Sequence, residues 1–576
     1  MPFTGIRMKS IRYLPLLLLL VLALAPAMAA QREPANPAAH PPGAAIASGH
    51  ALATDAGLAT IRAGGNAFDA AVTVSSVLSV VEPISSGLGG GGFFLLHDGK
   101  TGKDVFLDAR EIAPEAATPA AYLDKDGNLD PDKSENGPWS AGIPGLPAAL
   151  VELARKHGQL PLSRSLAPAI RIAREGFPVY ARLERGYASR REVMERYPGT
   201  RAVFLADGDP PQVGETLRQP DLARTLELLA DQGFDGFYRG DVAAKLVASV
   251  NAEGGEWKAE ELAGYRVRER EPIRFRYRGW NIVTAPPVSS GGVALAEILQ
   301  MVAGWDLARL DQAHRVHLLV EAMRRAYRDR TIYLGDPDFV KIPLPRLLSP
   351  DYAAGLRATI HPDKATPSAL LPGQPAPLED EETTHFSIID AEGNIVSATQ
   401  TVNLLYGSGL VAEGTGVILN DEMDDFALKP GTPNAFGVMG FDANKPEPGK
   451  RMLSSMTPTI MASPGKVAAL GAPGGSRIIT EVLLGILGYD DGLTAQQVAA
   501  KPRFHHQWLP DVISAEPDAL DADTVATLQA MGHSVNAGEG RWGNLQTVAW
   551  DRIADTLSGG TDPRNPVGKA AVQASP

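Results

Sequence analysis

The stretch Thr383-Thr384-His385-Phe386-Ser387 decides the fold of this sequence of 576 residues. It follows an acidic run, Glu379-Asp380-Glu381-Glu382, and opens a strand-like hydrophobic pattern. A buried strand rarely begins behind four consecutive acids, whereas an acidic loop before a threonine suits a self-cleaving precursor. A free N-terminal threonine carries nucleophile and base on one residue, because its own α-amine can accept the hydroxyl proton. The stretch therefore suggests that Thr383 becomes a new N-terminus.

The residues after Thr383 predict a β-hairpin. Two strand-like runs, 385–390 and 395–402, flank a turn whose aspartate and glycine fit a three-residue type I turn with a bulge. With the loop at 391–393, Thr383 lies directly across from Thr401.

Asn403 is the next residue on the face of Thr401, because strand side chains alternate with period two. A register error of one residue would move Thr401 to the opposite face. The alternative interpretation of Ser397, Thr399 and Thr401 is an ordinary exposed face, which is common in antiparallel sheets.

Upstream of the hairpin the chain alternates between helical and strand patterns. Small and apolar residues at helical spacing predict helices at 51–63 and 67–81, and a glycine turn at 87–92 leads into a buried strand at 93–96. Residues 145–260 are mostly amphipathic helix. The remaining expectations are a strand at 273–277, helices at 294–302 and 314–330, a leader at 31–45, an exposed linker at 361–382, and strands from 383 onward. This mixture favours an α+β layered fold.

Composition and the first thirty residues limit the function. Basic residues, an apolar run at 14–25 and Ala27-Met28-Ala29 predict a signal peptide over 1–30 and an exported, periplasmic or secreted protein. The apolar run is too short to span a bilayer, so we expect no membrane association after cleavage. A net charge of −13 argues against nucleic-acid binding. The absence of cysteine excludes disulfides and thiol catalysis.

The histidines invite two other interpretations. His314, His317 and Glu321 share one predicted helix, but no His-Glu-x-x-His motif is present, so we expect no metal. His505 and His506 lie beside Phe504 and Trp508 and are expected to pack structurally.

Motifs along almost the whole mature chain resemble the gamma-glutamyltransferases (gamma-glutamyltranspeptidases), a family of N-terminal-nucleophile hydrolases. The motifs are Glu82-Pro83, 87–93, 108–114, 142–145, 286–292, 333–337, Thr383-Thr384-His385-Phe386-Ser387, 401–407, 420–426, 453–456, 471–477 and 502–506. The resemblance implies a four-layer αββα sandwich and autocatalytic cleavage between Glu382 and Thr383. The large subunit, 31–382, and the small catalytic subunit, 383–576, would then form one heterodimeric composite domain.

The resemblance also implies the chemistry: Thr383 attacks the γ-amide of glutathione or a related γ-glutamyl compound. The resulting γ-glutamyl ester passes to water or to an amino acid or peptide acceptor, and no cofactor is implied. The resemblance implies that Thr401 bonds the nucleophile and that the backbone N–H groups of Gly474 and Gly475 bind the oxyanion. It implies that the α-carboxylate is bound by Arg110, Ser454 and Ser455. The implied acceptors for the α-ammonium are Asn403, Glu422 and Asp425.

One position departs from the family pattern. Phe436 stands in the predicted lid loop, 429–437, where the family often has a tyrosine. A phenylalanine can cover the pocket but cannot donate a hydroxyl hydrogen bond.

Two alternatives remain open. A related acylase acting on glutaryl or cephalosporin amides would share the nucleophile and oxyanion hole, but would need no acceptors for an α-ammonium. An unprocessed, non-catalytic exported binding protein is the alternative from another class.

Overall fold

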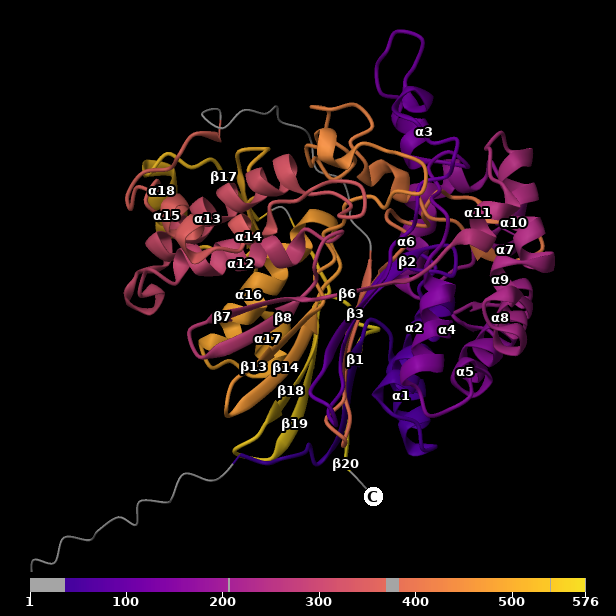
Figure 1. Ribbon diagram of the computed structural model, residues 1–576, viewed down its shortest axis with the longest axis horizontal. Helices are drawn as coiled ribbons and strands as arrows, with labels where there is room; N and C mark the ends of the chain where they lie inside the picture. Colours follow the sequence, from indigo (N-terminus) through magenta and orange to yellow (C-terminus); the bar gives the residue numbers. More distant parts are fainter. Residues whose placement is uncertain (1–36, 206–207, 369–382, 539, 575–576) are drawn as a thin grey trace, which may run out of the picture.

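Two antiparallel sheets lie face to face in the computed structural model, which describes residues 37–205, 208–368, 383–538 and 540–574. Helices cover the outer face of each sheet (Figure 1). The first sheet runs in the order β20 (Lys569–Ala574), β1 (Gly43–Ser48), β9 (Thr384–Ile389), β10 (Ile395–Thr401), β2 (Gly91–His97), β3 (Asp104–Ala109), β6 (Arg268–Arg270). The second runs in the order β19 (Thr556–Thr561), β18 (Gln546–Asp551), β14 (Lys466–Gly471), β13 (Thr459–Ala462), β8 (Trp280–Thr284), β7 (Ile273–Tyr277).

Helices from the first half of the chain lie on the side of the first sheet (Figure 1). They are α1 (Ala51–Arg62), α2 (Ala67–Val81), α4 (Leu146–His157), α5 (Leu162–Glu175), α6 (Ala181–Met194), α7 (Pro198–Phe204), α8 (Pro220–Gln232), α9 (Asp235–Tyr238), α10 (Gly240–Ala252) and α11 (Ala259–Gly264). The second sheet is covered by α12 (Gly291–Val302), α13 (Gln312–Tyr333), α14 (Leu344–Leu347), α15 (Pro350–Arg357), α16 (Ile478–Asp490), α17 (Ala495–Ala500) and α18 (Ala522–Ala530). The predicted α+β sandwich with four αββα layers is confirmed.

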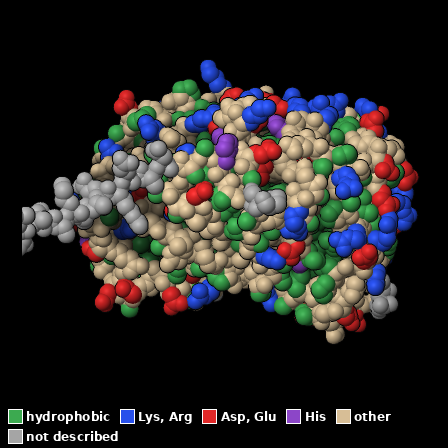
Figure 2. Space-filling view, turned by 90° about the horizontal axis from the view of Figure 1, so that it is seen from below, with side chains coloured by type: hydrophobic (Ala, Val, Ile, Leu, Met, Phe, Trp, Pro, Cys, Tyr) green, Lys and Arg blue, Asp and Glu red, His purple; other side chains and the backbone are tan. Residues whose placement is uncertain are grey.

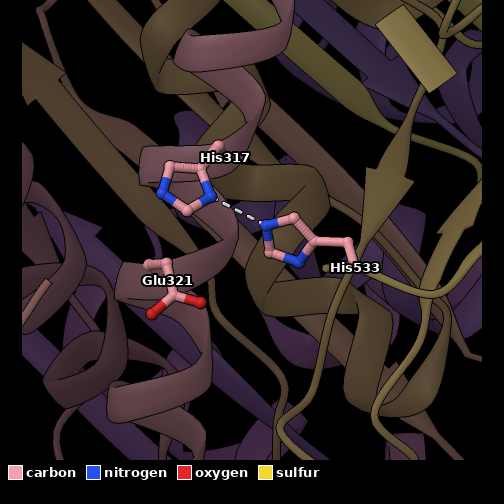
Figure 3. Close-up of side chains that lie close together, drawn as sticks. All are labelled: His317, Glu321 and His533. Atoms are coloured by element: carbon pink, nitrogen blue, oxygen red, sulfur yellow. Dashed lines mark hydrogen bonds between the residues drawn. The ribbon is translucent and has the colours of Figure 1, made fainter. Parts of the chain in front are cut away.

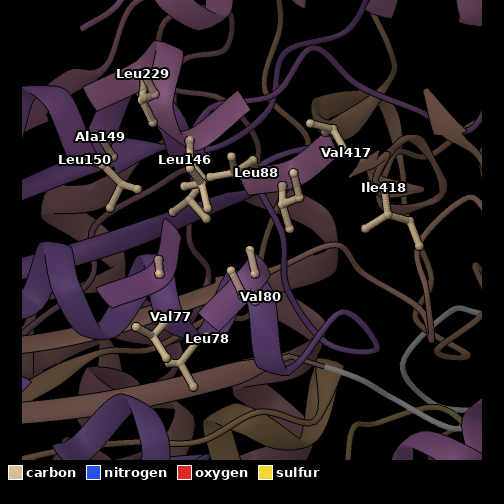
Figure 4. Packing of buried hydrophobic residues seen from close by; sticks show 14 of the residues in the cluster. Val77, Leu78, Val80, Leu88, Leu146, Ala149, Leu150, Leu229, Val417 and Ile418 are labelled. Carbon is tan, nitrogen blue, oxygen red and sulfur yellow. The ribbon is translucent and has the colours of Figure 1, made fainter. Parts of the chain in front are cut away.

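Strand alternation explains why the central strands read as continuous apolar runs. Phe94 and Leu96 of β2 pack into the core beneath α2 and α4, whereas Phe93 and Leu95 pack between the two sheets. Successive side chains point to opposite faces of a strand, and here both faces are covered. Figure 4 shows part of the helical core, where Val77, Leu78 and Val80 lie with Leu146, Leu150 and Ile418.

Local signals fix where α2 begins. The Asn66 side chain accepts from the N–H groups of Phe68 and Asp69, and the Asp69 carboxylate accepts from the N–H of Asn66. This reciprocal capping box satisfies donors that the first helical turn leaves unpaired. It follows Gly64-Gly65, the predicted break between the two N-terminal helices.

The predicted hairpin register is confirmed. Ile389 pairs with Ile395 and Thr384 with Gln400, so Thr383 and Thr401 are opposite. Asp390 Oδ1 accepts from the N–H groups of Glu392 and Asn394, and Gly393 adopts a φ of 84°. A positive φ is the reason for glycine at that position of the turn.

The interpretation of residues 397–401 as an exposed face is wrong. Ser397 and Thr399 are fully buried because this face of the first sheet packs against the second. The Ser397 hydroxyl donates to the carbonyl of Leu470 at 3.1 Å and accepts from the N–H of Thr459 at 3.0 Å. Ser397 is therefore bonded between the sheets, whereas Thr399 bonds His385 within the hairpin.

Two predicted boundaries are also corrected. The leader does not extend to residue 45, since β1 begins at Gly43 and is buried between β20 and β9. The described part of the predicted linker, 361–368, is not exposed throughout, since Ala365 and Ser368 are buried. Residues 369–382, including Glu382, and the predicted signal peptide lie outside the described residues.

The surface carries both signs of charge. Figure 2 shows Lys and Arg side chains interspersed with Asp and Glu over the described part of the face seen from below. A nucleic-acid-binding surface instead requires a concentrated basic patch. Among the described residues, no helix is long and apolar enough to cross a membrane.

Candidate active site

Thr383 immediately precedes β9, at the open end of the hairpin. Its side chain is buried, and its hydroxyl donates to Thr401 Oγ1 at 3.2 Å. Thr401 Oγ1 also accepts from the N–H of Asn403 at 2.8 Å. Asn403 adopts a φ of 81°, which redirects the chain after β10. One hydroxyl thus links the candidate nucleophile to the turn that places Asn403.

A small pocket opens at Thr383 and brings together ten of the eleven predicted site residues. Its lining residues are Arg110, Arg330, Thr383, Thr401, Asn403, Glu422, Asp425, Asn434, Phe436, Val438, Ser454, Ser455, Met456, Gly475, Ser476 and Ile478. They come from β10, α13, α16 and the loops at the ends of the strands, and from both predicted subunits. The eleventh, Gly474, lines a neighbouring groove together with Arg477 and Trp542.

Gly474 and Gly475 form the turn between β14 and α16. Their φ angles are 123° and 46°, and Gly474 has ψ 37°. Side-chain-bearing residues rarely adopt the first of these conformations, so glycine is required there. The glycine pair lies between the pocket and the groove, where backbone N–H groups can approach a reacting carbonyl.

Arg110 is buried and held by acids. Its guanidinium forms ion pairs with Glu422 and Asp425, and its Nε donates to the carbonyl of Met452 at 3.2 Å. Glu111 is buried 3.6 Å from the same guanidinium, and burial raises the pKa of Glu111 to about 7. Burial also raises the pKa of Glu422 and of Asp425, while Arg110 opposes both shifts.

The paired serines line the same pocket, and the cation bonded to them is Arg330. Arg330 Nη2 donates to Ser455 Oγ at 3.2 Å, and its Nε donates to Ser290 Oγ at 3.0 Å. The Ser290 hydroxyl in turn donates to the carbonyl of Ser454 at 2.7 Å. The sequence analysis did not identify Arg330 as a site residue. Its position at the end of the predicted helix 314–330, just before the family motif at 333–337, was the available signal.

The predicted lid lies over the pocket. Phe436 is 5% exposed, and its carbonyl accepts from Gln507 Nε2 at 3.1 Å. Asn434 Nδ2 donates to Asp425 Oδ1 at 3.2 Å, and the N–H of Ala435 donates to Asp424 Oδ2 at 2.8 Å. These bonds tie the loop directly to the acidic side of the pocket.

One group of side chains elsewhere has metal-ligating chemistry: His317, Glu321 and His533 (Figure 3). Their atoms already have partners. The histidine rings share a hydrogen bond of 2.8 Å, His317 Nε2 bonds the carbonyl of His361, and Glu321 is bonded by Arg324 and Arg325. The expectation that the chain binds no metal stays a prediction.

His505 and His506 are buried, as predicted for structural residues. His505 bonds Thr480 Oγ1 and Gln507 Oε1, each at 2.9 Å, and burial lowers its pKa to about 3. A neutral, fully bonded imidazole at this depth packs and orients Gln507. Through Gln507 it also supports the lid.

Comparisons with known proteins agree with this geometry. The family model for gamma-glutamyltranspeptidase matches residues 53–572. The chain is 46% identical to a glutathione hydrolase proenzyme of Pseudomonas sp. (strain A14), over 84% of each chain. It is 41% identical to the glutathione hydrolase proenzyme of Escherichia coli (strain K12), over 90% of each. A crystal structure of cephalosporin acylase from Bacillus halodurans superposes with a TM-score of 0.81 at 30% identity, covering 95% of this chain and 99% of that one.

The fold and the site thus define an N-terminal-nucleophile hydrolase. Within that class, the chain belongs to the gamma-glutamyltranspeptidase family.

Proposed function

We propose that the protein is a self-processing gamma-glutamyltransferase and glutathione hydrolase with Thr383 as its nucleophile. The observation that carries the proposal is the contact of Thr383 with Thr401 at the mouth of a pocket that contains both acids and arginines. A γ-glutamyl group presents an α-ammonium and an α-carboxylate, and this pocket contains groups of opposite charge for each. The high identity to glutathione hydrolase proenzymes supports the same donor.

Maturation would begin with Thr383 Oγ attacking the carbonyl of Glu382. The peptide C–N bond breaks, the hydroxyl proton passes to the leaving nitrogen, and an ester remains. Water then hydrolyses this ester, which frees the α-amine of Thr383 and the carboxylate of Glu382. The products are the chains ending at 382 and beginning at 383, which remain together because β9 is central in the first sheet.

In the processed enzyme the free α-amine would accept the proton of Thr383 Oγ during attack on the donor's γ-carbonyl. The N–H groups of Gly474 and Gly475 would stabilise the oxyanion. Collapse breaks the γ-amide and releases the amine, which takes up the proton. The γ-glutamyl ester then passes to water, giving glutamate, or to the amine of an amino acid or peptide, giving a new γ-glutamyl amide.

The acylase alternative fits less well. The acylase relative, Acylase ACY 1 proenzyme of Pseudomonas sp. (strain SE83), is 35% identical over 88% of this chain. The high TM-score with a cephalosporin acylase reflects a shared scaffold. An α-ammonium gives Asn403, Glu422 and Asp425 a ligand that a glutaryl group does not have. Export to the periplasm or beyond is part of the proposal and is supported by the sequence of residues 1–30.

The decisive experiment compares wild type with Thr383→Ala and Thr384→Ala by intact mass, N-terminal sequencing and glutathione turnover. We expect wild type to give two chains, the smaller beginning at Thr383, and to release glutamate. Thr383→Ala should stay uncut and inactive. Thr384→Ala is the matched control, because Thr384 lies on the opposite face beside Glu82, and it should be cut and active. An uncut, inactive wild type would refute the proposal and favour a non-catalytic binding protein.

A further inference from the structure

Two buried arginines with different surroundings line the donor pocket. Arg110 is in contact with both Glu422 and Asp425. Glu111 lies 3.6 Å from the same guanidinium, so three buried carboxyl groups share one positive charge and the cluster is acidic overall. Such a cluster complements an α-ammonium group. The charge of Arg110 is largely compensated before any donor arrives.

Arg330 provides the second positive charge. It extends from α13, is 8% exposed, and lines the same pocket as Thr383, Ser454 and Ser455. Among the described residues, no carboxylate lies within ion-pair distance, 4 Å, of its guanidinium. Its bonded partners are the neutral hydroxyls of Ser290 and Ser455.

Asp425 attracts Arg330 only from beyond contact distance. A buried cation with no carboxylate in contact is costly, and arginine does not relieve the cost by losing its proton. Burial lowers the pKa of Arg330, yet a guanidinium stays charged at any physiological pH. Two of its roughly five N–H donors are used in the bonds to Ser290 and Ser455. The remaining donors and the charge fit an anionic ligand.

We propose that Arg330 is a second cation of the donor site, which binds the donor's α-carboxylate together with Arg110, Ser454 and Ser455. This assignment rests on the proposed function and names a specificity residue for it. Arg330 binds the carboxylate directly and also orients the serines, because its bond to Ser290 continues to the carbonyl of Ser454. The pocket then recognises a zwitterion, with the carboxylate at Arg330 and the ammonium at Glu422 and Asp425.

The test uses two chromogenic donors that differ in one group. The first is a γ-glutamyl anilide, and the second is the same anilide with its α-carboxylate replaced by an uncharged carboxamide. Steady-state kinetics are measured for processed wild type, Arg330→Gln and Arg330→Lys. Removing a charge-assisted bond should raise KM for the carboxylate donor roughly tenfold to a hundredfold in Arg330→Gln. KM for the carboxamide donor should change less than about threefold, and kcat should change little for either donor.

Arg325→Gln is the matched control. Arg325 is another buried arginine of α13, but it is paired with Glu321. Its loss should lower the thermal stability and leave the ratio of the two KM values at the wild-type level. If Arg330→Gln changes both donors by the same factor, Arg330 has only a structural role and the inference fails.

Maturation is followed on a denaturing gel for every variant. If Arg330→Gln is not processed, the kinetics of Arg330→Lys test the inference instead, because lysine keeps the positive charge and lacks the planar fork of arginine. Arg330→Lys should raise KM for the carboxylate donor by roughly threefold to tenfold and leave the carboxamide donor unchanged; equal changes again overturn the inference. A wild type that cleaves neither donor would instead refute the proposed function.

Discussion

Thr401→Val removes the hydroxyl that joins the proposed nucleophile, Thr383, to the turn at Asn403 and changes the volume of the side chain very little. Thr401 Oγ1 accepts from Thr383 at 3.2 Å and from the N–H of Asn403 at 2.8 Å, and a methyl group can accept neither bond. The first bond contributes about 1 kcal/mol, and a buried N–H left without a partner costs about 1–3 kcal/mol. We expect roughly 1–2 kcal/mol of this loss to appear in the transition state.

A loss of that size lowers kcat/KM by roughly fivefold to thirtyfold, since about 1.4 kcal/mol is a factor of ten. The assay is initial-rate hydrolysis of a γ-glutamyl anilide, alongside a denaturing gel that follows processing over time. Slower cleavage of the precursor should accompany the slower turnover, because the proposed function uses the same hydroxyl pair in both steps.

Thr399→Val is the matched control, with the same exchange one step along the same strand face. Thr399 is buried and bonded to His385 Nδ1 at 2.8 Å, but it does not line the pocket. It should lower the free energy of unfolding by about 1–2 kcal/mol and leave kcat/KM within twofold of wild type. If the two variants lose activity equally, the effect comes from packing between the sheets and the reasoning about Thr401 is refuted.

Two further predictions concern the lid and the pH dependence of stability. Phe436→Tyr adds a hydroxyl donor above the pocket, and one hydrogen bond of about 1 kcal/mol should lower the donor KM roughly fivefold; an unchanged KM in steady-state kinetics would mean that the hydroxyl finds no partner. Burial lowers the pKa of His505 to about 3. Between pH 6.5 and 3, His505 is therefore protonated in the unfolded chain and neutral in the folded chain. Stability should therefore fall as the pH falls through this window, and His505→Gln should flatten the slope of unfolding free energy against pH by up to about 1 kcal/mol per unit. An identical slope in chemical denaturation of both proteins would show that His505 is protonated in the native state.

The hairpin could be predicted from sequence because its signals are local. Asp390 and Gly393 specify the turn, and the turn length sets the register that brings Thr383 opposite Thr401. The two N-terminal helices and the buried strand after the glycine turn follow from the same kind of pattern. Most of the eleven predicted site residues came from the family resemblance. The structure places ten of the eleven in one pocket.

The errors arise where a distant segment decides the outcome. Ser397 and Thr399 alternate like exposed residues, but β13 and β14, about 70 residues further along, cover them. β1 was missed because its alanine-rich sequence has little strand signal of its own. It is held by β9 and by β20 at the far end of the chain. Arg330 was missed because its lack of a carboxylate partner is visible only in three dimensions.

The same charge distribution explains why one scaffold can serve both glutamyl transfer and acyl hydrolysis. A glutaryl group would bring a carboxylate to Arg330 but no ammonium to the cluster of Arg110, Glu422 and Asp425. Negative charge on that cluster in excess of the charge of Arg110 would then stay buried without a counterion, which is costly at such depth. Burial has already raised the pKa values of Glu422 and Asp425, so the cluster could bind a proton in place of the missing ammonium. A glutaryl donor would therefore bind better as the pH falls, whereas a γ-glutamyl donor needs both acids ionised. On the proposed function, the acids around Arg110 would thus select the ammonium-bearing donor at neutral pH.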